Sequence, residues 1–172
     1  MTVSDYSFFA DVAATGLILG IGRGSTMQEV EDSLGGDYLD DHGDGFIRRD
    51  YGLLEITFLD RNGWSCGFII VEVHRLAGDR SLVPPAIEAR YGPLPARLTA
   101  GPYFTALTKR GFGPERVADD SASDYLRYVI PATECVIDVV DDPQDVVGWP
   151  GFGEVWSLSL NPLSKSGMNA PR

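Results

Sequence analysis

Residues 53–76 read LLEITFLDRNGWSCGFIIVEVHRL, two apolar runs on either side of a polar turn. In residues 53–59 and 67–76 apolar side chains recur at every second position, at Leu54, Ile56 and Phe58 and again at Ile69, Val71 and Val73, which is the period of a β-strand with one buried face. Asn62-Gly63 between the runs is a dipeptide that strongly favours a hairpin turn. These residues therefore predict two antiparallel strands joined by a hairpin.

Helix signals come before this hairpin. Residues 4–14 space their apolar side chains as a short helix does. Thr26 and Glu29 have the spacing of a capping box, so a second helix is expected to begin at Thr26 and to end at Gly35. A further strand is expected at 46–49, between this helix and the hairpin.

A second set of helix and strand signals follows residue 82. Helices followed by strands, twice over, predict an α+β protein with antiparallel sheet and with helices packed on one face of it. We expect a single domain, 1–161, of two similar helix-then-sheet halves (4–76 and 82–161), and a flexible tail at 162–172. The elements expected in the second half are helices at 84–91 and 103–110 and strands at 125–130, 133–140 and 154–160.

The chain is strongly acidic. Its 25 acidic and 14 basic residues give a formal net charge of −11. The negative electrostatic potential of such a chain repels nucleic acid and anionic lipid, and it speeds association with a basic protein. We therefore expect a basic protein partner, no nucleic acid and no membrane contact; the plainer alternative is that the charge only maintains solubility.

No apolar run approaches the ~20 residues that a membrane span requires. Residues 1–5 lack the positive charge that opens a secretory signal, so we expect a cytoplasmic protein. Cys66 and Cys135 lie in apolar runs and are expected to be buried, reduced thiols, with a disulfide as the alternative. Zinc binding is not expected, because neither cysteine belongs to a CxxC pair.

Two glycine-rich segments resemble ligand loops only in part. Residues 20–26 lack the lysine of a phosphate loop. Residues 40–45 begin like a calcium loop, but Tyr51 stands where the bidentate glutamate is needed. We expect an acidic turn at 40–45, no metal and no cofactor.

Strand alternation separates two faces of the sheet. It places Trp156, Leu158 and Leu160 inward in the last strand. An outward face that mixes carboxylates with a few apolar side chains suits contact with a basic protein surface, although antiparallel sheets often have one ordinary solvated face. The polar residues predicted to point outward are Glu55, Thr57, Glu72, His74, Glu134 and Asp138. The apolar residues Phe68 and Val136 are predicted to lie on the same face.

Three of these residues also support an enzyme hypothesis. Glu72 and His74 are two positions apart on one predicted strand, and Glu55 lies on the neighbouring strand. A carboxylate and an imidazole on one face are suited to acid–base catalysis or to holding a divalent metal. No sequence motif of a hydrolase or metalloprotease accompanies them.

A family resemblance rests on the order of these elements. The helix ending at Leu34-Gly35, the acidic turn and the runs 48–55 and 73–76 resemble small actinobacterial proteins suspected of immunity roles. The pattern from Gly24 through Leu34-Gly35 is also similar to the outer-membrane assembly lipoprotein family and to β-lactamase inhibitory protein. This resemblance implies two helix-then-sheet repeats that bind an enzyme with a concave sheet.

We therefore predict a non-enzymatic immunity or inhibitor protein, as in a toxin–antitoxin pair, that neutralises a basic toxin or enzyme. Aromatic residues would anchor the partner and carboxylates would steer it. A homodimer that uses the same face is an alternative. The residues predicted to bind the partner are Tyr38, Asp40, Asp41, Asp44, Glu55, Trp64, Glu72, His74, Glu134, Asp138, Trp149 and Phe152.

Overall fold

The computed structural model describes residues 6–118 and 124–161. The described residues form one antiparallel sheet of eight strands, in the order β1-β2-β3-β4-β8-β7-β6-β5, so that β4 pairs with β8 at its centre. The expected α+β class is confirmed. The strands are β1 (Leu39–Gly43), β2 (Phe46–Asp50), β3 (Leu54–Asp60), β4 (Trp64–Val71), β5 (Glu115–Arg116), β6 (Tyr125–Ile130), β7 (Cys135–Val140) and β8 (Val155–Leu160).

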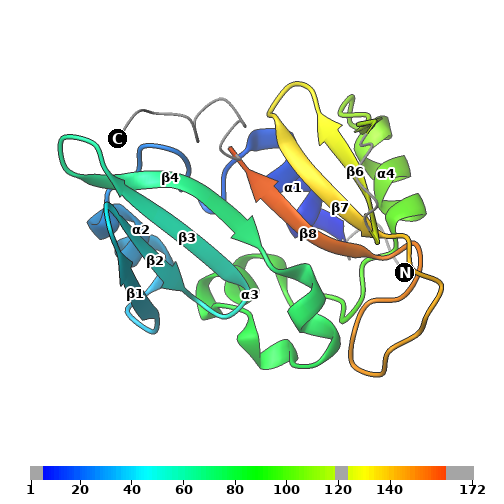
Figure 1. Cartoon of the computed structure of the whole chain (residues 1–172), viewed down its shortest axis with the longest axis horizontal. Coiled ribbons are helices and arrows are strands. Elements are labelled where there is room, and N and C mark those ends of the chain that lie inside the picture. The colour runs from blue at the N-terminus through cyan, green and yellow to red at the C-terminus, as the bar shows by residue number, and fades with distance from the viewer. Residues whose placement is uncertain (1–5, 119–123, 162–172) are drawn as a thin grey trace.

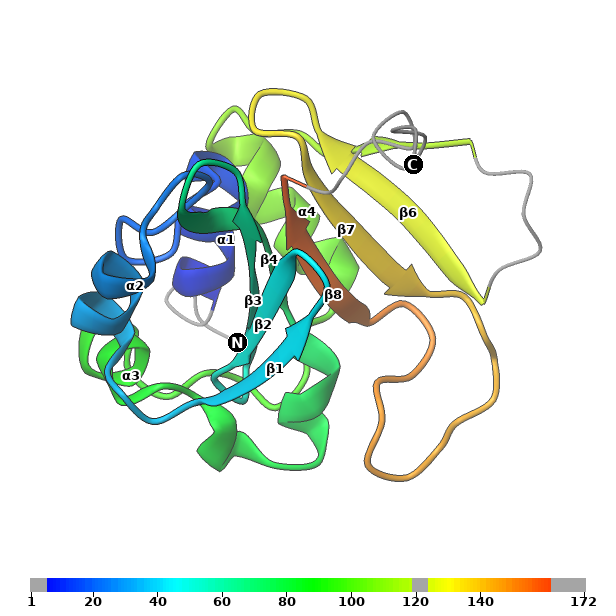
Figure 2. The same ribbon diagram turned by 60° about the vertical axis from the view of Figure 1, so that its left-hand side comes forward.

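Helix α1 lies behind β7 and β8 in the view of Figure 1, and Figure 2 shows α1, α2 and α3 together on one side of β2 and β3. The sheet is curved, and its two edge strands are β1 and β5. None of the described helices is long and apolar enough to span a membrane. The helices are α1 (Ser7–Thr15), α2 (Met27–Leu34), α3 (Pro85–Tyr91) and α4 (Ala100–Lys109), with short 3-10 helices η2 (Val73–Ala77) and η3 (Arg80–Leu82).

The start of α2 is the predicted capping box. The Thr26 hydroxyl accepts from the Glu29 backbone N–H at 3.2 Å, and the Glu29 carboxylate accepts from the Thr26 backbone N–H at 2.7 Å. Two N–H groups that the helix itself leaves unpaired are thereby satisfied. The β3–β4 hairpin is also confirmed, with Asn62 at φ 66° and Gly63 at φ 113° in its turn.

The core lies between the sheet and the helices. Leu54, Ile56 and Phe58 of β3 are fully buried, as their alternation predicts. Helices α1 and α4 are tied together where the buried Tyr103 hydroxyl donates to the Phe9 carbonyl at 2.9 Å. Cys66 is buried and is a free thiol, as expected, and burial raises its pKa to about 12. Cys135 is likewise buried and free.

Several predicted element boundaries are wrong: β4 begins at Trp64 rather than at 67, α4 at Ala100 rather than at 103, and β7 at Cys135 rather than at 133. The strand expected at 67–76 ends at Val71, and η2 follows it. The acidic turn expected at 40–45 is largely strand β1, with only Asp44-Gly45 left as the turn to β2. This strand is stabilised because its carboxylates lie directly opposite arginines: Asp40 pairs with Arg49 and Asp41 with Arg48 across the ladder.

The prediction that Trp156 points inward is also wrong. Asp138 pairs with Ser157 and Val139 pairs with Val155, so Trp156 is an extra residue in β8, a β-bulge. A shift of one residue exchanges the two faces of a strand. Val155 and Leu158 are therefore buried, whereas Trp156 is only partly buried.

Residues 4 and 5 of the first predicted helix and the predicted tail at 162–172 lie outside the described residues.

Candidate functional site

The side of the sheet away from the helices is named the outer face, and cross-strand pairs define it. Thr57 lies opposite Phe68, and Ser159 lies between Ile70 and Val136. Core residues occupy the alternate positions of the same strands. The outer face thus crosses β3, β4, β8 and β7 without interruption.

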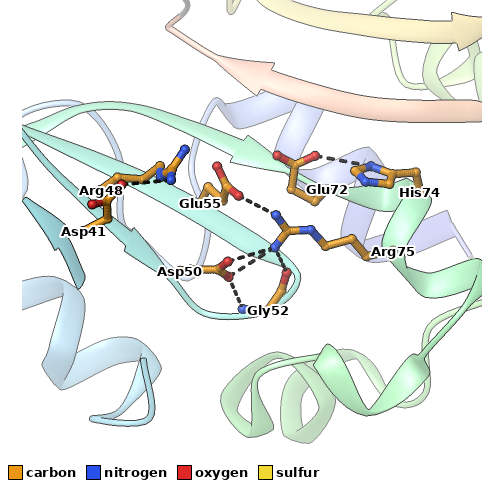
Figure 3. Close-up of polar contacts among 8 residues, drawn as sticks. All are labelled: Asp41, Arg48, Asp50, Gly52, Glu55, Glu72, His74 and Arg75. Carbon is orange, nitrogen blue, oxygen red and sulfur yellow. Dashed lines mark hydrogen bonds and ion pairs between the residues drawn. The ribbon is translucent and has the colours of Figure 1, made fainter. Parts of the chain in front are cut away.

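At one end of the outer face, Arg75 of η2 joins three groups of the β2–β3 segment (Figure 3). Its Nη1 donates to both carboxylate oxygens of Asp50, at 3.1 and 3.2 Å, and to the Gly52 carbonyl at 2.7 Å, while its Nη2 donates to Glu55. Gly52 has φ 83°, and a Cβ there would lie 2.7 Å from the Leu82 carbonyl oxygen. Only glycine fits this turn, which holds Asp50 and Glu55 against the guanidinium.

Beside Arg75 are Glu72 and His74, with 3.3 Å between the Glu72 Oε2 and the His74 Nδ1. Their side chains are only 12% and 15% exposed. Burial, and then the charge of Glu55, raises the pKa of Glu72. Burial, and then the charge of Arg75, lowers the pKa of His74, which favours a neutral imidazole at neutral pH.

The His74 ring belongs to an aromatic stack. It lies 4.1 Å from the Trp156 ring, and Trp149 lies 5.2 Å from Trp156, with all planes within 6° of parallel. His74 and Trp149 are only 5.6 Å apart. Rings on opposite faces of Trp156 would be about 7 Å apart, twice the contact distance. His74 and Trp149 therefore lie side by side over the same face of Trp156.

Several predicted outward residues lie on the outer face but are well covered. Glu55 is 16% exposed and held by Arg75, and Asp138 is 16% exposed and held by Arg127 at 2.8 and 3.0 Å. Thr57 is 6% exposed. The predicted carboxylates therefore alternate with arginines. For Asp138 the signal was present in the sequence, since Arg127 and Asp138 occupy facing positions of two adjacent predicted strands.

Glu134 does not lie on a strand. It is exposed, has φ 57° and belongs to the turn between β6 and β7. Asp41 is exposed and pairs with Arg48 at the β1 edge, and Asp44 is exposed in the next turn. These acidic residues lie at the margins of the sheet rather than among the residues around Arg75.

Tyr38 and Asp40 are placed on the opposite side of the sheet. Asp40 accepts two hydrogen bonds, at 2.8 and 2.9 Å, from the buried Arg49, whose guanidinium lies 3.5 Å over the Tyr38 ring. The Tyr38 hydroxyl donates to Glu31 of α2 at 3.0 Å. This arrangement, named the Arg49 cluster, fixes β1 and β2 to α2.

Large exposed apolar side chains occur at two ends of the sheet. Trp64, 37% exposed, begins β4 at the hairpin end, near Phe46 at the start of β2. The 141–154 loop, which joins β7 to β8 at the opposite end, exposes more of them. Its exposed members are Val146 (56%), Val147 (100%), Trp149 (45%) and Phe152 (66%).

Within the described residues, no group of three or more His, Cys, Asp or Glu side chains is arranged to hold a metal ion. Comparisons of the chain with protein-family models, with curated proteins and with solved structures find no match.

Proposed function

We propose that this chain is an immunity- or inhibitor-type protein that binds and neutralises a basic toxin or enzyme through the outer face of its sheet. The observation that carries the proposal is the apolar surface of the 141–154 loop. Four large apolar side chains stand exposed there, and one of them, Trp149, stacks on Trp156 of the outer face. Clustered exposed apolar surface is a feature of interaction sites, because it stabilises a complex when it is buried.

The charge around these apolar residues supports a basic partner. Asp141, Asp142 and Asp145 belong to the same loop, and the whole chain carries a net charge of −11. Most carboxylates of the outer face are paired with arginines, so the free negative charge lies around the loop and the sheet margins. Apolar anchors would then supply affinity, and the surrounding carboxylates would speed association.

The order of elements supports an architecture of two similar halves. Two helices precede β1 to β4, and two helices precede β5 to β8. The last strands of the two sets, β4 and β8, lie side by side at the centre of the sheet. We propose that each half contributes four strands to a shared outer face, in line with the sequence resemblance to tandem-repeat inhibitors.

The test is a binding measurement by calorimetry against the product of the neighbouring gene, the expected toxin or enzyme. Trp149→Ala and Phe152→Ala should each weaken binding about 10-fold or more, as truncation of an aromatic anchor does. Leu17→Ala is the matched control, since Leu17 is 43% exposed but follows α1. Unchanged affinity in both aromatic variants would contradict the proposal.

One observation favours a second candidate function, an enzyme that uses Glu72 and His74. Their pKa values are shifted in opposite directions, as in many acid–base pairs of active sites. An activity found in a panel of hydrolase and phosphatase substrates should be lost in His74→Phe and kept in His42→Phe, which changes the exposed second histidine. Equal activity in both variants would remove this candidate.

A further inference from the structure

A pocket of about 210 Å³ lies between β6, β8 and the 141–154 loop. Drug-sized ligands usually occupy pockets of about 300–1,000 Å³, so this one suits a single side chain. Three aromatic rings and two carboxylates are among the described residues that line it, and none of these residues is a lysine or an arginine. The aromatic and acidic lining residues are Tyr125, Trp149, Trp156, Asp124 and Asp142.

The aromatic wall comes from three separate segments. Trp149 and Trp156 are nearly parallel, with ring centres 5.2 Å apart, and Tyr125 is tilted by 59° against Trp156 at 5.3 Å. The bulge in β8 is what brings Trp156 to this side of the sheet. The faces of indole and phenol rings carry negative potential and attract cations, with tryptophan the strongest.

Backbone hydrogen bonds fix the Asp142 carboxylate and the main chain at Asp124. Asp142 accepts a hydrogen bond from the Gln144 backbone N–H at 2.9 Å, and the chain beside Asp124 is fixed by the hydrogen bond from Asp141 N–H to the Asp124 carbonyl at 2.7 Å. The pKa of the Tyr125 phenol is raised by burial and then by Asp124, Asp138 and Asp142. The pocket is therefore an electronegative site with apolar walls.

We propose that this pocket binds the side chain of an arginine. The guanidinium group is planar and weakly hydrated, stacks on indole and pairs with carboxylates, whereas a lysine ammonium is compact and strongly hydrated. This inference rests on the proposed function only in the source of the arginine, which would be the surface of the basic partner. The pocket itself is testable without that partner.

The experiment titrates N-acetyl-arginine N-methylamide into the purified chain and follows the indole N–H resonances of its three tryptophans by NMR. Trp149 and Trp156 should shift saturably with a Kd on the order of millimolar, as for a small fragment. Trp64, in the β3–β4 hairpin, should not move and is the internal control. The neutral citrulline derivative should cause no saturable shift.

A pair of acid variants tests the electrostatic part. Asp142→Asn should weaken binding of the arginine derivative about 5-fold, whereas Asp44→Asn, in the exposed β1–β2 turn, should leave it unchanged. Equal shifts with arginine and citrulline, or parallel shifts of all three tryptophans, would overturn the proposal. The corresponding lysine derivative is titrated in the same way. Equal affinity for it would overturn the assignment to arginine.

The outcomes separate this inference from the proposed function. Absence of arginine binding contradicts the proposed arginine site but leaves the apolar loop surface free to bind a partner. Arginine binding without measurable affinity for the basic gene product keeps the pocket and removes the proposed function.

Discussion

Two arginines organise opposite sides of the same sheet, and they differ in how much water reaches them. The Arg49 side chain is 3% exposed and holds Asp40 and the Tyr38 ring on the helix side. The Arg75 side chain is 26% exposed and holds Asp50 and Glu55 on the outer face. The same chemistry thus belongs to the core in one place and to the partly exposed outer face in the other.

The largest loss of stability is expected when the buried arginine, Arg49, is removed. In Arg49→Ala the ion pair and the ring contacts are lost, and Asp40 is left without its two hydrogen bonds. We expect a loss of about 3 kcal/mol in the free energy of unfolding, measured by urea denaturation. Arg48→Ala is the control, because its partner Asp41 is 65% exposed, and it should cost less than about 0.5 kcal/mol.

Removal of Arg75, on the outer face, should reduce the free energy of unfolding by a smaller amount. Arg75→Ala removes four hydrogen bonds, but Asp50 is 37% exposed and water replaces part of what is lost. We expect a loss of about 1–2 kcal/mol in the same measurement. Arg75→Lys should keep part of the charge effect but not the fork of hydrogen bonds. A loss as large as that of Arg49→Ala would contradict the distinction between the two sides.

Regular strands were predictable because burial follows alternation wherever pairing is regular. Leu54, Ile56 and Phe58 are buried as predicted, and Ile137 and Val139 are buried at alternate positions of β7. In β8 the same rule held for Leu158 and Leu160 but failed at Trp156, since one extra residue reverses the faces on its N-terminal side and local composition does not mark its position. The error fell at Trp156, a residue central to the candidate site.

The predicted site was limited for a related reason. Ion pairs between facing strands, such as Arg127 with Asp138, can be found once the register is known. Arg75 instead reaches Asp50, 25 residues away, from a 3-10 helix that alternation read as strand. Tyr38 and Asp40 were assigned to the binding surface from their residue type, although the buried Arg49 places them on the helix side.

Because of the bulge, neighbouring residues of β8 allow the outer face and the core to be compared within one strand. Trp156→Ala removes a ring from the outer face, where it contacts His74 and Trp149, and not from the core. The loss in unfolding free energy should therefore be about 1–2 kcal/mol, below the ~3–5 kcal/mol of a core tryptophan. Leu158→Ala changes a fully buried residue of the same strand and is the matched core control. It should reduce the free energy of unfolding by about 3 kcal/mol.

The smallest expected effect is the pH dependence of stability that His74 and Glu72 produce. Because the fold lowers the pKa of His74 below its usual 6.5, the unfolded chain binds more protons than the folded chain as pH falls through 6.5. This group therefore destabilises the fold progressively below that pH. Glu72 acts in the opposite direction, since its raised pKa makes the folded chain bind more protons above 4.5.

In His74→Phe, which retains an aromatic ring in the stack, the decline in unfolding free energy from pH 7 to 5.5 should be smaller than in the unmodified chain. Glu72→Gln should steepen the same decline, because it removes the group that gains stability as pH falls. Urea denaturation of both variants and of the unmodified chain at each pH measures this decline, and parallel curves would mean that neither Glu72 nor His74 is coupled to folding through its proton.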